Sequence, residues 1–193
     1  FTISTKVCDL FYKNKKKLPK QVLKSVQKEL AGIERITGKK FGDLKNPLLV
    51  SVRSGARISM PGMMDTILNL GLNDQTVKAL AIKTLNERFA KDSYRRFIQM
   101  YSNVVLNIEN HLFENLIDNQ KLTGGVLLDT ELDERDWDIL IQRFKELVKK
   151  ETKKNFPQNI EDQLYGAVSA VFLSWESKRA KTYRKLNQIP DHW

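Results

Sequence analysis

The chain has 193 residues, of which 41% are hydrophobic and 29% charged, and this is the composition of an ordinary globular protein with a sizeable core. No apolar run approaches the about 20 residues that a membrane-spanning helix needs, so we expect no contact with a membrane. A single cysteine, Cys8, excludes an intrachain disulfide and fits a reducing compartment. We therefore expect a cytoplasmic protein in which this thiol is neutral rather than nucleophilic.

The net charge of +10 favours an anionic partner, such as a nucleotide, a nucleic acid or an anionic membrane. The densest basic run, Lys13 to Lys20, has no interleaved aromatic residue on which nucleic-acid bases would stack. A solvated basic surface is the favoured interpretation of this run. A basic helical module that binds RNA or another anion stays as the alternative function.

The first third of the chain predicts a small α/β unit. Residues 1–5 alternate in polarity and predict a short strand, and a helix is expected over about 6–14. Pro19 is a plausible first residue of the next helix, and Gly38 ends it. A β-rich run over 48–53 predicts a second strand, and the apolar run 63–70 predicts a short helix. Two or three strands are too few for a stable sheet, so we expect further sequence beside this segment to complete it.

After residue 74 the sequence predicts helices almost throughout. Asp92 and Asp133 are placed to cap two of them, and aromatic residues recur on one face of each. Further helices are expected over about 111–122, 160–175 and 178–187. In this part Arg95 and Arg96 could bind phosphate, but an ion pair with Asp92 or another acid is the favoured interpretation.

The stretch from Leu48 to Asp74 carries the strongest functional signal. Its strand leads into Arg53 and Arg57, which are interleaved with Ser54 and Gly55. Arginine offers a planar fork of donors to phosphate oxygens, and glycine and serine let backbone N–H groups approach an anion. These residues predict an anion-binding loop, but an ordinary strand, turn and helix with surface arginines is equally compatible with them.

Long motifs decide between these interpretations by resemblance. VRSGARISMPGMMDTILNLGLND, RFAKDSYRRFIQMYSNVV and PQNIEDQLYGAVSAVFLSWESKRAKTYRKLNQIPDHW closely resemble segments of the pyruvate, phosphate dikinase family, in its N-terminal ATP-grasp-like nucleotide-binding domain. The family converts ATP, phosphate and pyruvate to AMP, pyrophosphate and phosphoenolpyruvate through a phosphohistidine. The resemblance implies that this chain is a fragment of such an enzyme.

The resemblance also implies an ATP site. Arg53 would contact the ATP phosphates, and Ser54, Gly55 and Arg57 would continue that loop. The segment containing Met60, Gly62 and Met63 would lie over the nucleotide. Met60, Met63 and Met64 could instead be core filler, but the break at residues 61–62 favours exposure and a gate over the adenine.

The same resemblance implies residues that this chain lacks. The phosphate-binding lysine, the ligands of the Mg²⁺ that accompanies ATP and the carrier histidine belong to other segments of the family. His111 and His192 lie in other contexts, and surface roles are expected for both. We therefore expect no metal ligand and no catalytic residue in this chain, and an inactive isolated fragment.

The expected fold is α+β and predominantly helical: a partial ATP-grasp-like domain with a helical subdomain. We expect residues 1–73 to form the α/β part, 74–157 the helical subdomain, and 158–193 helices that return to the first part. The expected partners are ATP, the phosphohistidine domain and pyruvate-binding barrel of the same polypeptide, and a second copy in a full-length homodimer; no nucleic acid is expected. A third hypothesis is a product of a split gene with a structural role.

Overall fold

A computed structural model describes residues 1–55 and 58–190 of the chain. Helices dominate, so the predicted α+β, predominantly helical class is confirmed. In chain order the helices are α1 (Lys6–Lys13), α2 (Lys20–Thr37), α3 (Thr76–Thr84), α4 (Glu87–Val104), α5 (Asn110–Gly124), the 3₁₀ turn η1 (Asp129–Glu131), α6 (Glu134–Thr152), α7 (Ile160–Ser174) and α8 (Lys178–Leu186).

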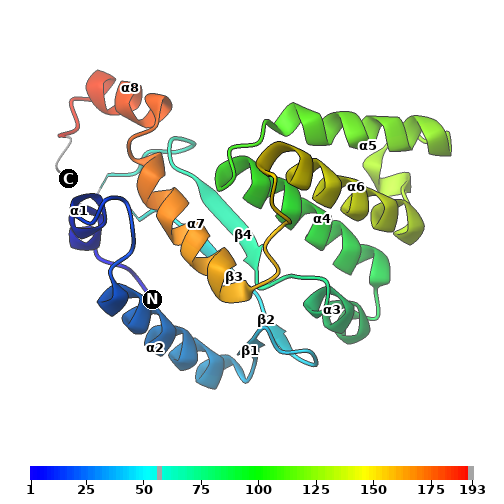
Figure 1. Ribbon diagram of the computed structural model, residues 1–193, viewed down its shortest axis with the longest axis horizontal. Helices are drawn as coiled ribbons and strands as arrows, with labels where there is room; N and C mark the ends of the chain where they lie inside the picture. Colours follow the sequence, from blue (N-terminus) through cyan, green and yellow to red (C-terminus); the bar gives the residue numbers. More distant parts are fainter. Residues whose placement is uncertain (56–57, 191–193) are drawn as a thin grey trace.

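The described strands form two small two-stranded sheets. β1 (Lys40–Phe41) and β2 (Pro47–Leu48) are parallel, while β3 (Val50–Arg53) and β4 (Thr66–Leu70) are antiparallel. In the second sheet Val50 lies opposite Leu70, and Arg53 lies opposite Thr66. The β3–β4 sheet lies between α4 and α7, both of which contact β4 (Figure 1). These two helices cover the sheet. The loop that connects β3 to β4 begins after Arg53, at one end of the sheet.

Residues 74–157, all of which the structure describes, contain helices and no strand. We refer to them as the helical segment. Helix α4 is its centre, because it packs against α3, α5 and α6 (Figure 1). The aromatic face predicted for α4 is buried, and its rings continue into the core through edge contacts. Phe97 and Tyr101, for example, both pack on Phe156, with ring centroids 5.8 and 5.6 Å apart.

Several predicted helix ends are confirmed by their caps. The Asp133 carboxylate accepts hydrogen bonds from the backbone N–H groups of Arg135 and Asp136, so α6 begins where its sequence predicts. Gly38 ends α2 with φ of 65°, in the left-handed region that suits glycine. The helices predicted over 6–14, 160–175 and 178–187 are found within two residues of those limits.

Three predictions of local structure differ from the structure, two of them entirely and one in part. Residues 1–5 form no strand, because no described strand lies beside them to accept their hydrogen bonds, and they pack against α2 instead. The run 63–70 is not a helix: its second half is β4, which pairs with β3. The predicted strand over 48–53 is confirmed in its larger part, since residues 50–53 form β3, but Leu48 belongs to the separate strand β2.

A fourth prediction, the cap of α4, is also wrong. The helix begins one and a half turns earlier than expected, after Asn86, whose side chain accepts a hydrogen bond from the backbone N–H of Phe89. Asp92 lies inside the helix, where its carboxylate pairs with Arg95 at 2.5 Å and with Arg96 at 3.0 Å. The ion pair expected for these arginines is thus confirmed, and Asp92 does not cap because the helix already begins after Asn86.

Trp137 is the largest fully buried side chain of the core and is 1% exposed. The guanidinium of Arg95 lies over its ring, 4.5 Å from the ring centroid, and that of Arg88 lies 6.0 Å away. Arg88 also donates to the backbone oxygen of Leu132 at 2.7 Å, which fixes the η1 turn against the indole. One ring therefore supports both α4 and the turn before α6.

We expect Trp137→Ala to lower the free energy of unfolding by about 3–5 kcal/mol, because it leaves a cavity and removes the aromatic partner of a buried cation. Urea unfolding followed by circular dichroism would measure this. The control is Leu122→Ala, since Leu122 is 79% exposed on α5 and its truncation leaves no cavity. Equal losses for both variants would contradict the central position of Trp137.

Candidate functional site

The candidate site lies where β3 ends and β4 begins, at the end of the sheet opposite to the chain's connection with the helical segment. Arg53 is the last residue of β3, and its pairing with Thr66 fixes its backbone. Its side chain is exposed, and no hydrogen bond or ion pair joins it to a described residue. A cation presented in this way from a strand end is free to bind an anion.

The loop after Arg53 contains the other predicted site residues. Ser54 is half-buried and Gly55 is exposed, so the backbone here is accessible. Arg57, the second arginine of the motif, lies outside the described residues, as does His192. The structure thus places Arg53, Ser54 and Gly55 together.

The Pro61-Gly62 pair forms a tight turn in the second half of this loop. The backbone N–H of Met63 donates to the oxygen of Met60 at 3.1 Å, and Gly62 has φ of 72°. Proline followed by a residue of positive φ is the arrangement of a type II turn. The turn reverses the chain so that Met60 and Met63 both face α8.

Met60 is core filler rather than an exposed gate. It is 7% exposed and packs with Ala180 and Ile189, with Met63 and Met64 partly buried against the same cluster. The expectation that the Pro61-Gly62 break exposes these methionines is therefore wrong for Met60. The turn directs it toward α8, where its flexible side chain fills the space beside a small residue.

An ion pair that sequence reasoning missed fixes the end of the loop. Arg179 of α8 pairs with the carboxylate of Asp65, and its Nε donates to the backbone oxygen of Met63 at 3.1 Å. Asp65 directly precedes β4, so α8 is attached to the strand that lies beside Arg53. Because the two residues are 114 positions apart, no local pattern could have indicated this pair.

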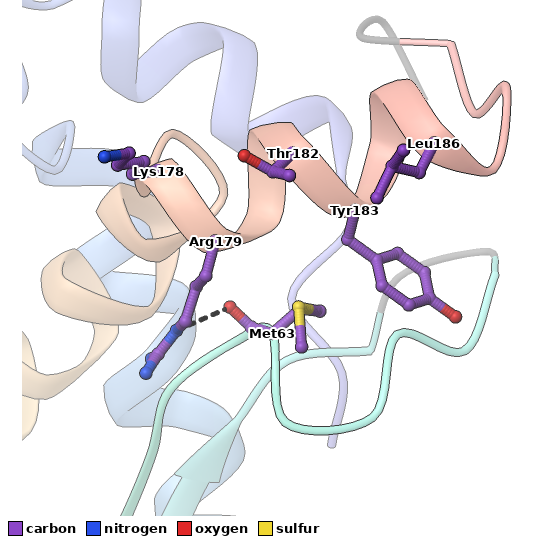
Figure 2. Close-up of a pocket in the computed structure, with 6 residues that line it drawn as sticks. All are labelled: Met63, Lys178, Arg179, Thr182, Tyr183 and Leu186. Atoms are coloured by element: carbon purple, nitrogen blue, oxygen red, sulfur yellow. Dashed lines mark hydrogen bonds between the residues drawn. The ribbon is translucent and has the colours of Figure 1, made fainter.

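An open groove of about 520 Å³ runs between this loop and α8, and its walls are mostly apolar (Figure 2). Two cations, Lys178 and Arg179, lie at one end of it. Its other lining residues are Met63, Thr182, Tyr183 and Leu186. The groove therefore combines a flat apolar wall with positive charge and lies on the same loop as Arg53.

The remaining candidates have structural or surface roles. His111 is exposed, and its ring lies 3.0 Å from the carboxylate of Glu109. Burial raises the pKa of the Cys8 thiol, and the charges of Asp9 and Glu176 raise it further, so the thiol stays neutral at physiological pH. In the part of the chain that the structure describes, no three His, Cys, Asp or Glu side chains are placed to hold a metal ion.

Comparison with known proteins decides the family. A family model described as "Pyruvate phosphate dikinase, AMP/ATP-binding domain" matches residues 3–193. The chain belongs to this family. The resemblance predicted from the sequence motifs is thereby confirmed. None of the described helices combines the length and apolar character needed to cross a membrane.

Curated members of the dikinase family align with the whole chain. A pyruvate, phosphate dikinase from Clostridium symbiosum is 50% identical over 194 residues, which is 100% of this chain and 22% of that protein. One from Rhizobium meliloti is 48% identical over 100% of this chain and 21% of that protein. A chloroplastic one from Flaveria pringlei is 46% identical over 97% and 20%. The chain thus spans about a fifth of the length of these relatives.

Met60 provides a test of the loop's anchoring. We expect Met60→Ala to destabilise the packing of the loop against α8 by about 2 kcal/mol. This value is at the lower end of the range for truncation of a buried methionine, because the cluster around Met60 is small. Hydrogen exchange would show faster exchange in residues 58–65 and in α8, with α4 and α6 unchanged. Met63→Ala, which removes a half-buried side chain, should have a smaller effect. Unchanged exchange in Met60→Ala would restore the gate interpretation.

Proposed function

We propose that this chain is the ATP-binding portion of a pyruvate, phosphate dikinase, and that Arg53 binds the phosphates of the nucleotide. The observation that carries the proposal is the free, exposed guanidinium of Arg53 at the end of β3. The full-length enzyme would convert ATP, phosphate and pyruvate to AMP, pyrophosphate and phosphoenolpyruvate; the names of the relatives include pyruvate and phosphate, and the description of the family model includes AMP and ATP.

Other arginines of the chain are paired with carboxylates and Arg53 is not paired with a described one, and this difference supports the proposed role. Arg179 is held by Asp65, and Arg95 and Arg96 share Asp92, so their charges are already compensated. Arg53 has no such carboxylate among the described residues. Its guanidinium can donate two parallel hydrogen bonds to phosphate oxygens. Such a contact strengthens as negative charge develops on a transferring phosphoryl group.

The loop after Arg53 would complete the contact. We propose that the backbone N–H groups at Ser54 and Gly55 also face the phosphates, and that Arg57 adds a second cation. The segment with Met60, Gly62 and Met63 would border the nucleotide, with Met60 acting as the anchor. Mg²⁺ would accompany ATP and neutralise phosphate charge, but the described carboxylates form no site for it, so its ligands would come from other segments.

We further propose that residues 1–73 and 158–193 form one unit and that 74–157 is a helical subdomain inserted into it. The phosphohistidine domain and the pyruvate-binding barrel would belong to the same polypeptide, as the greater length of the relatives suggests. A cytoplasmic homodimer is the expected full-length form. The RNA-binding alternative is not favoured, because the aromatic rings of the helical segment, apart from that of Phe89, are buried rather than available for stacking.

In the full-length enzyme we expect Arg53→Ala to slow the ATP half-reaction by about 100-fold or more, and to spare transfer between phosphohistidine and pyruvate. Arg53→Lys should restore little, because an ammonium group cannot form the bidentate contact. The two partial reactions are measured separately by exchange of labelled phosphate or pyruvate.

The control for this experiment is Arg135→Ala, which removes an exposed arginine of α6 far from the loop. It should leave both partial reactions unchanged. If both partial reactions fall equally in Arg53→Ala, or the ATP half-reaction survives, Arg53 is structural and the proposed site is wrong.

A second expectation concerns the isolated chain. The purified 193-residue protein should form no ATP from phosphoenolpyruvate, AMP and pyrophosphate, because its described residues include neither a metal site nor a histidine placed for phosphoryl transfer. A coupled luminescence assay would detect the product, with a full-length relative as the positive control. Sustained ATP formation would show that the chain carries catalytic groups of its own.

A further inference from the structure

Five large apolar side chains are exposed along one edge of the molecule. They come from the end of α2, the turn between β1 and β2, the end of α3 and the first turn of α4. We name this surface the apolar edge; it consists of Ile36, Leu44, Ile82, Leu85 and Phe89. Single exposed apolar residues are ordinary, but a group of them is typical of a surface that binds another protein segment.

Hydrogen bonds from one side chain hold the contributing elements together. The Asn46 amide donates to the backbone oxygen of Gly38 at 3.0 Å, which fixes the β1–β2 turn to the end of α2. The Asn46 side-chain oxygen also accepts a hydrogen bond from Lys83, so the same turn is attached to α3. Helix α3 contacts β2 as well, and these elements follow one another along the lower side of Figure 1. The edge is therefore one surface rather than scattered residues.

Leu85 is the most exposed residue of the apolar edge, and two of its features are energetically unfavourable. It is 93% exposed, and it ends α3 in the left-handed region with φ of 51° and ψ of 31°. Glycine or asparagine normally occupies such a position, because a side chain there strains the backbone. Strained positions concentrate at functional sites. Among the seven described non-glycine residues with positive φ, Leu85 alone has an apolar side chain, and this fits a side chain that contacts a further segment.

The rim of the apolar edge is positively charged. Lys39, Lys40, Lys45 and Lys83 are exposed around it. The nearby acids are engaged locally: Glu87 pairs with Lys91 at 2.7 Å, and the Asp43 carboxylate accepts hydrogen bonds from two backbone N–H groups of its own turn. A second copy of the same edge would bring lysines against lysines. The rim instead fits a surface that carries carboxylates around an apolar centre.

We propose that the apolar edge is the docking surface for another part of the same full-length polypeptide, one with an apolar centre and acidic flanks. The proposal rests on the proposed function, since it requires the chain to be a portion of a longer dikinase. Relatives in which this region is 22% or 21% of the length have about four times as much additional chain to accommodate. Interfaces between domains of one chain are commonly built from such mixed apolar and charged surfaces.

Chemical protection of Leu85 tests the proposal. In a Cys8→Ser background, Leu85→Cys is labelled with a maleimide in the 193-residue chain and in the full-length polypeptide, and peptide-level mass spectrometry gives the rate. We expect labelling to be about ten-fold slower or more in the full-length protein, because the docked part excludes the reagent. Lys150→Cys on α6, which is also exposed, is the matched control and should label equally fast in both. Equal rates at Leu85, or equal protection at both positions, would overturn the proposal.

A second variant keeps the test valid if the cysteine perturbs folding. Leu85→Lys in the full-length protein should speed hydrogen exchange over residues 82–89 by about five-fold or more, with unchanged circular dichroism, because an added cation disfavours docking against carboxylates. No change would overturn the proposal. Dimers of the 193-residue chain that Leu85→Lys dissociates, or binding to phosphatidylserine vesicles that it abolishes, would assign the edge to another occupant. Neither readout uses nucleotide, so the labelling result and the Arg53 result can fail independently.

Discussion

The buried amide of Gln163 joins the segments on which the rest of the fold depends. Its oxygen accepts a hydrogen bond from the backbone N–H of Gly71 at 3.3 Å, and its nitrogen donates to the oxygens of Leu72 and Pro157, each at 2.9 Å. One side chain of α7 therefore holds the chain where it leaves the β3–β4 sheet and where it returns from the helical segment. A buried amide satisfied in this way contributes more to a unique geometry than an apolar side chain of the same size. Gly71 permits the approach: it has φ of 104°, and a Cβ there would lie 2.8 Å from the Phe41 ring.

A second set of hydrogen bonds continues this junction outward. Tyr94 and Lys145, from α4 and α6, both reach the Asp74 carboxylate at 2.9 Å, and Gln158 donates to the Tyr94 hydroxyl at 3.2 Å. Burial strongly raises the pKa of Tyr94, so its hydroxyl remains a donor over the physiological range. The helical segment is thus held at a defined angle to the β3–β4 sheet. Because Val50 and Leu70 lie at this junction and Arg53 and Thr66 at the opposite end, the sheet connects the junction to the candidate site.

The limits of sequence prediction follow from where the deciding interactions lie. Helix α6 was predictable because its cap, Asp133, is adjacent to the residues it caps. Strand β4 was not, because a five-residue apolar run fits a helix or a strand equally well, and pairing with β3 decided the outcome. Asp92 failed as a cap for a different reason: a better cap, Asn86, lies six residues earlier, and Asp92 is left inside the helix, where it pairs with Arg95 and Arg96. In the site, the long motif predicted Arg53, but nothing local indicated Asp65 and Arg179.

The anchors of the site loop divide it into two halves with different roles. Met60 packs under α8 and Asp65 pairs with Arg179, so the half that leads into β4 is fixed to the body of the protein. The half that begins at Ser54 has no comparable anchor among its described residues, and it follows the arginine whose backbone the sheet holds in place. An anion that binds Arg53 would therefore meet an arginine whose backbone the sheet holds in place and whose exposed side chain is not engaged by any described residue. The fixed backbone lowers part of the entropic cost of binding, and the ordering of the side chain adds to that cost.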